Sequence, residues 1–182
     1  MIFDTISNRL QASLIENGLV SLSLTTCNVS EIVWEVVRSY QFLAHEKRQK
    51  LTFIVKDRPT LFTDKRWLRE VVDQLVSNAI KFTPIGKRID VQLSVREGRV
   101  VIEVQDEGLG LSFADQEHLF KRYTRLSAMP TGGECATGLG LSLTRRLVEL
   151  LGGSIWAYSE GPNKGSTFFV ELAQDHSAAQ AS

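Results

Sequence analysis

Two short segments in which apolar and polar residues largely alternate, 89–95 and 100–105, constrain the fold of this chain most strongly. They flank Glu97-Gly98, and a turn signal between two alternating segments predicts a β-hairpin. A hairpin with one apolar face is not stable alone in water, because that face needs a packed partner. The sequence therefore predicts antiparallel strands covered on one side by a second layer.

Helical periodicity supplies the second layer. Apolar residues recur with helical spacing over 31–47, 65–82, 139–151 and, more briefly, 113–125. Ser30 and Asp64 are suited to cap the first two helices, because their side-chain oxygens can accept from free backbone N–H groups. Further short strands are expected over 19–25, 51–55, 61–62, 155–158 and 167–172. This irregular alternation predicts the α+β class, with helices packed on one face of a mixed sheet.

The two ends of the chain differ in pattern. Near the N-terminus, apolar residues recur every four positions, at Ile2, Ile6, Leu10 and Leu14. This spacing predicts an amphipathic helix over 1–16, whose stripe would pack on the rest of the chain or on a second copy of itself. The segment 173–182 lacks an apolar pattern and is expected to be a disordered tail.

Composition argues against several classes of function. The 21 Lys and Arg residues balance the 21 Asp and Glu residues, which argues against a domain that binds nucleic acid by bulk charge and against a polybasic membrane anchor. Cys27 and Cys135 lie far apart, which argues against a zinc site or a disulfide scaffold. No apolar run reaches the roughly 18–20 residues of a membrane span. Together with the balanced charge and the two separate cysteines, this predicts a cytoplasmic protein that binds no nucleic acid. Zero net charge still leaves room for a local anion site.

The helix predicted over 65–82 carries polar residues beside its apolar face. Gln74, Asn78 and Lys81 fall along one edge of that face at helical spacing. An Asn side chain offers a neutral oxygen suited to Mg²⁺, and a Lys ammonium is a point charge for phosphate. An ordinary solvated boundary would contain the same residue types, so this row by itself leaves both interpretations open.

Three glycine-containing segments add candidates. Asp106-Glu107-Gly108-Leu109-Gly110 follows a strand and places a carboxylate above tightly turned backbone, where it can accept from an exocyclic amine such as that of adenine. Thr137-Gly138-Leu139-Gly140-Leu141 opens a helix, whose free N–H groups and dipole favour an anion. Gly165-Ser166-Thr167 turns into the last strand and brings a hydroxyl to the same region. Each segment taken singly is equally explained as a plain turn.

Taken together and in order, these segments resemble the catalytic ATP-binding domain of sensor histidine kinases, within the wider superfamily of gyrase, heat-shock chaperone and mismatch-repair ATPases. The pattern consists of NAIKFTP from Asn78, DEGLG from Asp106, LFKRY from Leu119, TGLGLSL from Thr137, LLGGSIWAYSE from Leu150 and GST from Gly165. The resemblance implies a two-layer α/β sandwich, the Bergerat fold, with three helices on the sheet and a flexible lid over ATP at about 112–137. It assigns 29–172 to the catalytic domain and 1–28 to the end of a dimerisation-domain helix and its linker.

The resemblance also implies roles for individual residues. Asn78 would hold Mg²⁺, Lys81 would contact phosphate, and Gln74 would belong to the same catalytic box. Asp106 would accept a hydrogen bond from the adenine amine, in part through water shared with Thr167. The remaining ATP-binding positions implied by the resemblance are Gly108, Gly110, Phe120, Tyr123, Arg125, Thr137, Gly138, Leu139, Gly140 and Leu141.

The implied reaction transfers the γ-phosphoryl group of ATP to a histidine on a dimerisation domain, for relay to the receiver domain of a response regulator. A homodimer through the N-terminal helix would be a further partner. The alternative is a nucleotide-binding regulatory module without transferase activity.

Three departures from the family pattern qualify this expectation. Gln74 stands where the family usually has Asn, and because Gln cannot act as a general base at neutral pH, we expect poor intrinsic ATP hydrolysis. Ala136 replaces the first glycine of the usual G-x-G-x-G run, which bears on the lid. His45-Glu46 echoes a phosphoacceptor, but Lys50 stands in place of the usual proline, so we expect the acceptor to lie outside this chain.

Overall fold

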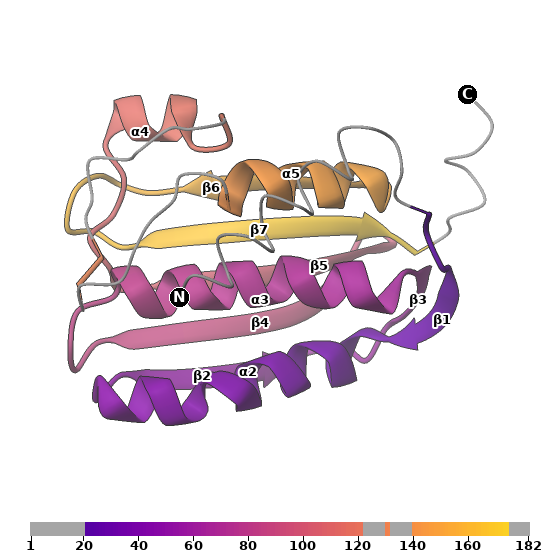
Figure 1. Cartoon of the computed structure of the whole chain (residues 1–182), viewed down its shortest axis with the longest axis horizontal. Coiled ribbons are helices and arrows are strands. Elements are labelled where there is room, and N and C mark those ends of the chain that lie inside the picture. Colours follow the sequence, from indigo (N-terminus) through magenta and orange to yellow (C-terminus); the bar gives the residue numbers. More distant parts are fainter. Residues whose placement is uncertain (1–20, 122–129, 132–139, 175–182) are drawn as a thin grey trace.

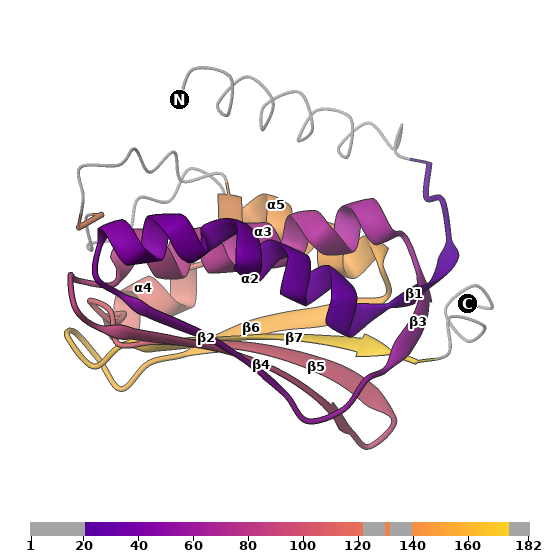
Figure 2. The same ribbon diagram turned by 90° about the horizontal axis from the view of Figure 1, so that it is seen from below.

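The structure, a computed structural model, describes residues 21–121, 130–131 and 140–174. In these residues a layer of helices covers one face of a five-stranded sheet (Figures 1 and 2). The helices are α2 (Val29–Glu46), α3 (Lys65–Phe82), α4 (Phe113–His118) and α5 (Gly140–Leu150). The strands are β1 (Thr25–Asn28), β2 (Lys50–Val55), β3 (Thr60–Thr63), β4 (Arg88–Arg96), β5 (Arg99–Asp106), β6 (Gly153–Tyr158) and β7 (Ser166–Ala173). The predicted α+β class and two-layer sandwich are confirmed.

The main sheet has the strand order β2-β4-β5-β7-β6. The β2–β4 pair is parallel, and the other three pairs are antiparallel. The predicted hairpin is the β4–β5 pair, in which Arg96 lies opposite Arg99 across a turn formed by Glu97 and Gly98. Strands β1 and β3 form a separate antiparallel pair at the end of the molecule opposite α4 (Figure 1).

Side-chain caps set where the two long helices begin. The carboxylate of Asp64 accepts from the backbone N–H groups of Arg66 and Trp67 at 2.9 and 3.2 Å, so α3 starts where the sequence predicts. Asn28, not Ser30, caps α2, because its side-chain oxygen accepts from the Ser30 N–H at 3.1 Å and the helix begins at Val29. A single cap two residues earlier thus shifts the start of α2.

Several sequence-based boundaries differ from the structure, most clearly those of β1 and α4. The strand expected over 19–25 is instead β1, Thr25–Asn28, because its pairing with β3 decides where a strand forms. These four residues therefore belong to the folded domain, although they lie within the linker expected over 1–28. Helix α4 ends at His118 rather than near 125, and buried Leu119 follows it. The helix expected over 1–16, and the tail beyond 174, lie outside the described residues.

Helix α3 is the centre of the helical layer. It packs against α2 on one side and α5 on the other, and against β4 and β5 beneath (Figure 2). For this reason Trp67, Val76 and Ile80 are buried in addition to the apolar arc that the periodicity predicts. The half-buried row of Gln74, Asn78 and Lys81 remains at the edge of this wide apolar face. No helix in the described ranges is long and apolar enough to cross a membrane.

Candidate nucleotide-binding site

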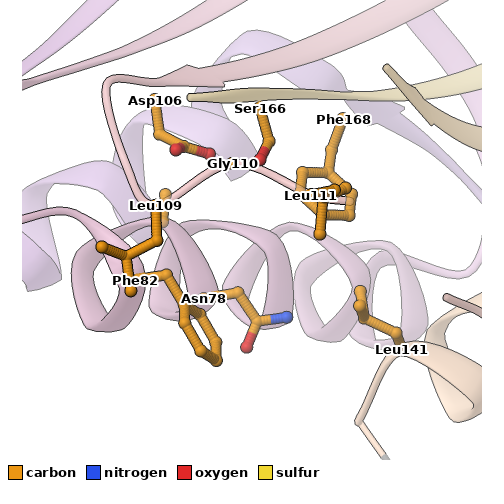
Figure 3. Close-up of a pocket in the computed structure, with 10 residues that line it drawn as sticks. Asn78, Phe82, Asp106, Leu109, Gly110, Leu111, Leu141, Ser166 and Phe168 are labelled. Carbon is orange, nitrogen blue, oxygen red and sulfur yellow. The ribbon is translucent and has the colours of Figure 1, made fainter. Parts of the chain in front are cut away.

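A pocket opens between α3, the turn after β5, the start of α5 and the beginning of β7 (Figure 3). Its walls are mainly apolar, with a carboxylate, a hydroxyl and a carboxamide among them. It is lined by Asn78, Ala79, Phe82, Asp106, Leu109, Gly110, Leu111, Leu141, Ser166 and Phe168. Such a lining suits a ligand that is flat and mostly apolar and carries a few polar groups at its edge.

Asp106 is the charged group of the pocket, and the β-sheet places it there. It ends β5 on the same face as Ile102 and Val104, which is the face that the helices cover. Asp106 is buried, and burial raises the pKa of its carboxyl to about 6, against the lowering effect of hydrogen bonds from the backbone of Gly108 and Ser166. Burial disfavours the charged form of a carboxyl, and a donor group on a ligand would favour it.

Ser166, rather than Thr167, brings the hydroxyl to this pocket. Asp106 and Ser166 are directly opposite each other in the antiparallel β5–β7 pair, so both side chains point to the same face. Thr167 lies opposite exposed Gln105, and side chains alternate between faces along a strand, so Thr167 points to the other face of the sheet. The water shared with Thr167 therefore has no basis in this geometry.

The turn after β5 needs small residues because backbone approaches it closely. A Cβ on Gly108 would lie 2.8 Å from the carbonyl oxygen of Phe82 and would also meet the Asp106 carboxylate. The Leu109 N–H donates to the same Phe82 oxygen at 3.2 Å, which ties the turn to the end of α3. Gly110 has a positive φ of 67° and packs against the backbone of Gly161. The turn is thereby held against two neighbouring segments.

The polar row of α3 is only partly at the pocket. Asn78 lines it, and Gln74 reaches it indirectly by donating a hydrogen bond from Nε2 to Asn78 Oδ1 at 3.1 Å. Lys81 is half-buried and does not line the pocket. Burial raises the pKa of Asp73 on the same helix, and the hydrogen bond from Tyr40 and the charges of Arg69 and Lys81 partly lower it.

The other positions implied by the resemblance fall into three groups. Gly140 and Leu141 begin α5, and Leu141 lines the pocket. Phe120 is half-buried against the core and does not line the pocket. The positions that lie outside the described residues are Tyr123, Arg125, Thr137, Gly138 and Leu139, and Ala136 lies there too.

Several pocket residues were missed by sequence reasoning. They are the apolar walls Ala79, Phe82, Leu109, Leu111 and Phe168, together with Ser166, whose segment was named but whose role was given to Thr167. Strand alternation carried a usable signal for two of them, because Ser166 and Phe168 share the face of Val170 and Leu172. The turn residues Leu109 and Leu111 carried no such signal.

The sequence profile of the family described as "Histidine kinase-, DNA gyrase B-, and HSP90-like ATPase" matches residues 63–176. This chain belongs to that family. The match contains the whole of α3, the pocket turn and β7, so the pocket lies within the segment that defines the family.

Individual relatives of this ATPase family extend the likeness over nearly the whole chain. The histidine-protein kinase BarA of Escherichia coli K12 is 33% identical over 177 residues, which cover 93% of this chain and 19% of BarA. The sensory kinase SasA of Synechocystis is 34% identical over 170 residues, which cover 92% of this chain and 43% of SasA. The chain thus spans less than half the length of these relatives. A crystal structure of full-length ShkA with AMPPNP has the same fold, with a TM-score of 0.83 and 24% identity over 96% of this chain and 36% of ShkA.

The donor set of this ATPase-family pocket fits a purine nucleotide. A buried carboxylate can accept from an exocyclic amine, apolar side chains flank the space beside it, and Gly110 exposes backbone to the same space. Among the described residues no cluster of three or more His, Cys, Asp or Glu side chains could hold a metal. Asn78 Oδ1 is the neutral oxygen at the pocket, which fits Mg²⁺ bound mostly by phosphates and water rather than by a protein cage.

Proposed function

We propose that this chain is the catalytic ATP-binding domain of a sensor histidine kinase, which transfers the γ-phosphoryl group of ATP to a histidine of a dimerisation domain. The observation that carries the proposal is the buried Asp106 carboxylate, which shares one apolar pocket with the Asn78 carboxamide. The two groups suit opposite ends of ATP. The carboxylate suits the amine of the base, and the carboxamide oxygen suits a cation held by the phosphates. The names of the relatives BarA and SasA support the same conclusion.

At the base end, Asp106 would accept from the exocyclic amine of adenine. The apolar side chains of Ala79, Leu111 and Phe168 would surround the ring, and Gly110 would let it approach the backbone. The hydroxyl of Ser166 lies beside Asp106 and offers a second polar contact at this end (Figure 3). A donor on the base would stabilise the ionised form of a carboxyl whose pKa burial raises.

At the phosphate end, Asn78 Oδ1 would be the protein ligand of Mg²⁺, and Lys81 would reach the phosphates from the next turn of α3. Bound Mg²⁺ supplies charge neutralisation on the phosphate oxygens. The positive end of the α5 helix dipole, at Gly140, favours an anion at the same place. Gly138, Leu139 and Arg125 complete this end in the proposal.

In the proposed reaction an imidazole nitrogen attacks the γ-phosphorus. The bond from phosphorus to the β–γ bridging oxygen breaks, the new phosphorus–nitrogen bond forms, and ADP leaves with that oxygen. This domain contributes positioning and charge neutralisation. Gln74 cannot take a proton at neutral pH, so it does not activate water, and the histidine remains the favoured nucleophile.

The proposed partners are the dimerisation domain that bears the histidine and the receiver domain of a response regulator. Residues 1–28 would lead from that dimerisation domain, with Thr25–Asn28 already paired with β3, and 29–172 would form the rest of the catalytic domain. The tail, 173–182, would begin at the last residue of β7. His45 is exposed on the last turn of α2 and leads into β2, which does not suit it as the acceptor.

Binding and transfer test the proposal separately. We expect ATP with Mg²⁺ to raise the melting temperature of the chain, and Asp106→Asn to remove the shift. Glu97→Gln, the same chemical change on the exposed β4–β5 turn, should retain it. The full-length protein should then form acid-labile phosphohistidine with labelled ATP. Binding without any phosphohistidine would favour the regulatory module, and absence of binding would refute both functions.

A further inference from the structure

The side chain of Gln74 lies between the start of α5 and Asn78. Its carboxamide rests against Gly140, the first residue of α5, so closely that a Cβ there would lie 2.8 Å from Gln74 Cδ and nearer still to Nε2. The same Nε2 donates to Asn78 Oδ1, one turn further along α3, at 3.1 Å. One amide therefore contacts both the helix end that suits phosphate and the oxygen that suits Mg²⁺.

In the structure Asn78 presents its oxygen to the NH₂ group of Gln74. A carboxamide oxygen has two lone pairs, and Gln74 uses one of them. The second lone pair remains available for a cation.

Gly140 is held near Gln74 because α5 packs against α3 and its first turn is stabilised from within. The hydroxyl of Thr144, which is 2% exposed, donates to the carbonyl oxygen of Gly140 at 2.8 Å and fixes the first turn. The far end of a Gln side chain is flexible, so it is Gln74 that would yield to any added atom at position 140. A Cβ there would displace the carboxamide and break its contact with Asn78.

We propose that Gln74 is a positioning residue whose length is matched to Gly140, and that it orients the Asn78 oxygen toward the cation of bound nucleotide. The role rests on the proposed function, because it acts on the same Mg²⁺–ATP. It also gives Gly140 a reason to lack a side chain, because the nearest atoms to a Cβ there all belong to Gln74. Gln74 acts without changing its protonation state.

A double-mutant cycle tests this role by titrating the chain with ATP, with and without Mg²⁺. Gln74→Ala and Gly140→Ala should each weaken Mg²⁺–ATP binding about three- to tenfold, the scale of one lost hydrogen bond. The double variant should bind no more weakly than either single variant, because both remove the same contact. Without Mg²⁺, Gln74→Ala should bind like the wild type. Losses that multiply in the double variant, or a Gln74→Ala loss of equal size without Mg²⁺, would overturn the role.

Two further variants separate hydrogen bonding from packing. Gln74→Met keeps an unbranched side chain of similar length but has no N–H donor, so it should weaken Mg²⁺–ATP binding as much as Gln74→Ala. Gln74→Asn is one methylene shorter and no longer reaches Gly140, so adding Gly140→Ala to it should cause no further loss. Wild-type affinity in Gln74→Met would show that packing alone is at work and would refute the role.

Controls distinguish this role from the proposed function. Gln105→Ala, on the exposed face of the sheet, should leave binding unchanged. Each Gln74 variant should melt within a few degrees of the wild type, since its amide is only half-buried. A wild-type chain that binds no ATP would refute the proposed function and this role with it. If the wild type binds ATP but the losses of affinity in the two single variants multiply in the double variant, only the role of Gln74 is refuted.

Discussion

Asp106 and Ser166 lie directly opposite each other at the paired ends of β5 and β7, and both face the pocket. Their register assigns the hydroxyl at this site to Ser166 and directs Thr167 to the far face. We therefore expect Ser166→Val to weaken ATP binding by about tenfold or more, because added methyl groups would enter a filled, polar corner. Thr167→Val should leave the affinity within about twofold, since that side chain points away. Isothermal titration of both variants measures this, and the reverse ranking would contradict the register.

The raised pKa of Asp106 predicts how stability and binding depend on pH. Because the folded-state pKa is about 6, above the ordinary value of 3.8, the folded chain holds more protons than the unfolded chain between these values. The contribution of Asp106 to stability is therefore greatest below about pH 4, falls as pH rises to 6, and stays constant above that. Denaturant unfolding at a series of pH values from 4 to 8 measures this fall. In Asp106→Asn the decrease in unfolding free energy between about pH 4 and 6 should be absent.

Nucleotide binding should show the opposite dependence on pH. An ionised Asp106 accepts a hydrogen bond from the adenine amine better than a neutral carboxyl does. ATP affinity should therefore fall as pH drops below about 6. Titrations with ATP at pH 5, 6 and 8 measure this change. A nucleotide that lacks the exocyclic amine is the control, because it should bind more weakly and its affinity should change less with pH.

The close approach at Gly110 predicts a large loss of stability on adding one methyl group. Gly110 and Gly98 both have positive φ, of 67° and 73°, so an alanine at either position costs about 1 kcal/mol of backbone strain. A Cβ on Gly110 would also collide with the Gly161 backbone, whereas a Cβ on Gly98 would meet nothing within 4 Å. Gly110→Ala should thus lower the free energy of unfolding by at least about 1 kcal/mol more than Gly98→Ala. Equal losses in urea unfolding would show that the turn can shift freely.

Lys47 is expected to stabilise the end of α3 that leads into the pocket. Its ammonium donates to the carbonyl oxygen of Ile80 at 2.7 Å and to the hydroxyl of Thr131 at 2.9 Å, and it faces the negative end of the helix dipole. Lys47→Met should lower the free energy of unfolding by about 1–3 kcal/mol, because it removes charge-assisted hydrogen bonds. Lys87→Met, on the exposed turn before β4, should change it by less than about 0.5 kcal/mol.

Local patterns were sufficient to predict the parts of the fold that local interactions stabilise. The bounds of α3 follow from the Asp64 cap and the apolar periodicity, and the β4–β5 hairpin follows from alternation around Glu97-Gly98. The order of the glycine-containing segments predicted the family and the placement of Asp106 and Asn78 in one pocket. For α3 and the hairpin the deciding contacts join residues that are close in sequence. For the family, the order of the motifs is specific as a whole.

Tertiary structure alone decided what depends on partners distant in sequence. Strand β1 forms where β3 pairs with it, and α3 buries Trp67 and Ile80 because α2 and α5 flank it. Ser166 faces the pocket because its register with Asp106 places both on the helix-covered face.

The sequence by itself determined most of the helices and strands, the family, and the Asp106 and Asn78 groups of the site. Only the folded chain decided which face each group occupies and that Gln74 joins Gly140 to Asn78. The physical reason is that periodicity reports burial of one element against an unspecified neighbour, whereas register and packing distance exist only once that neighbour is in place.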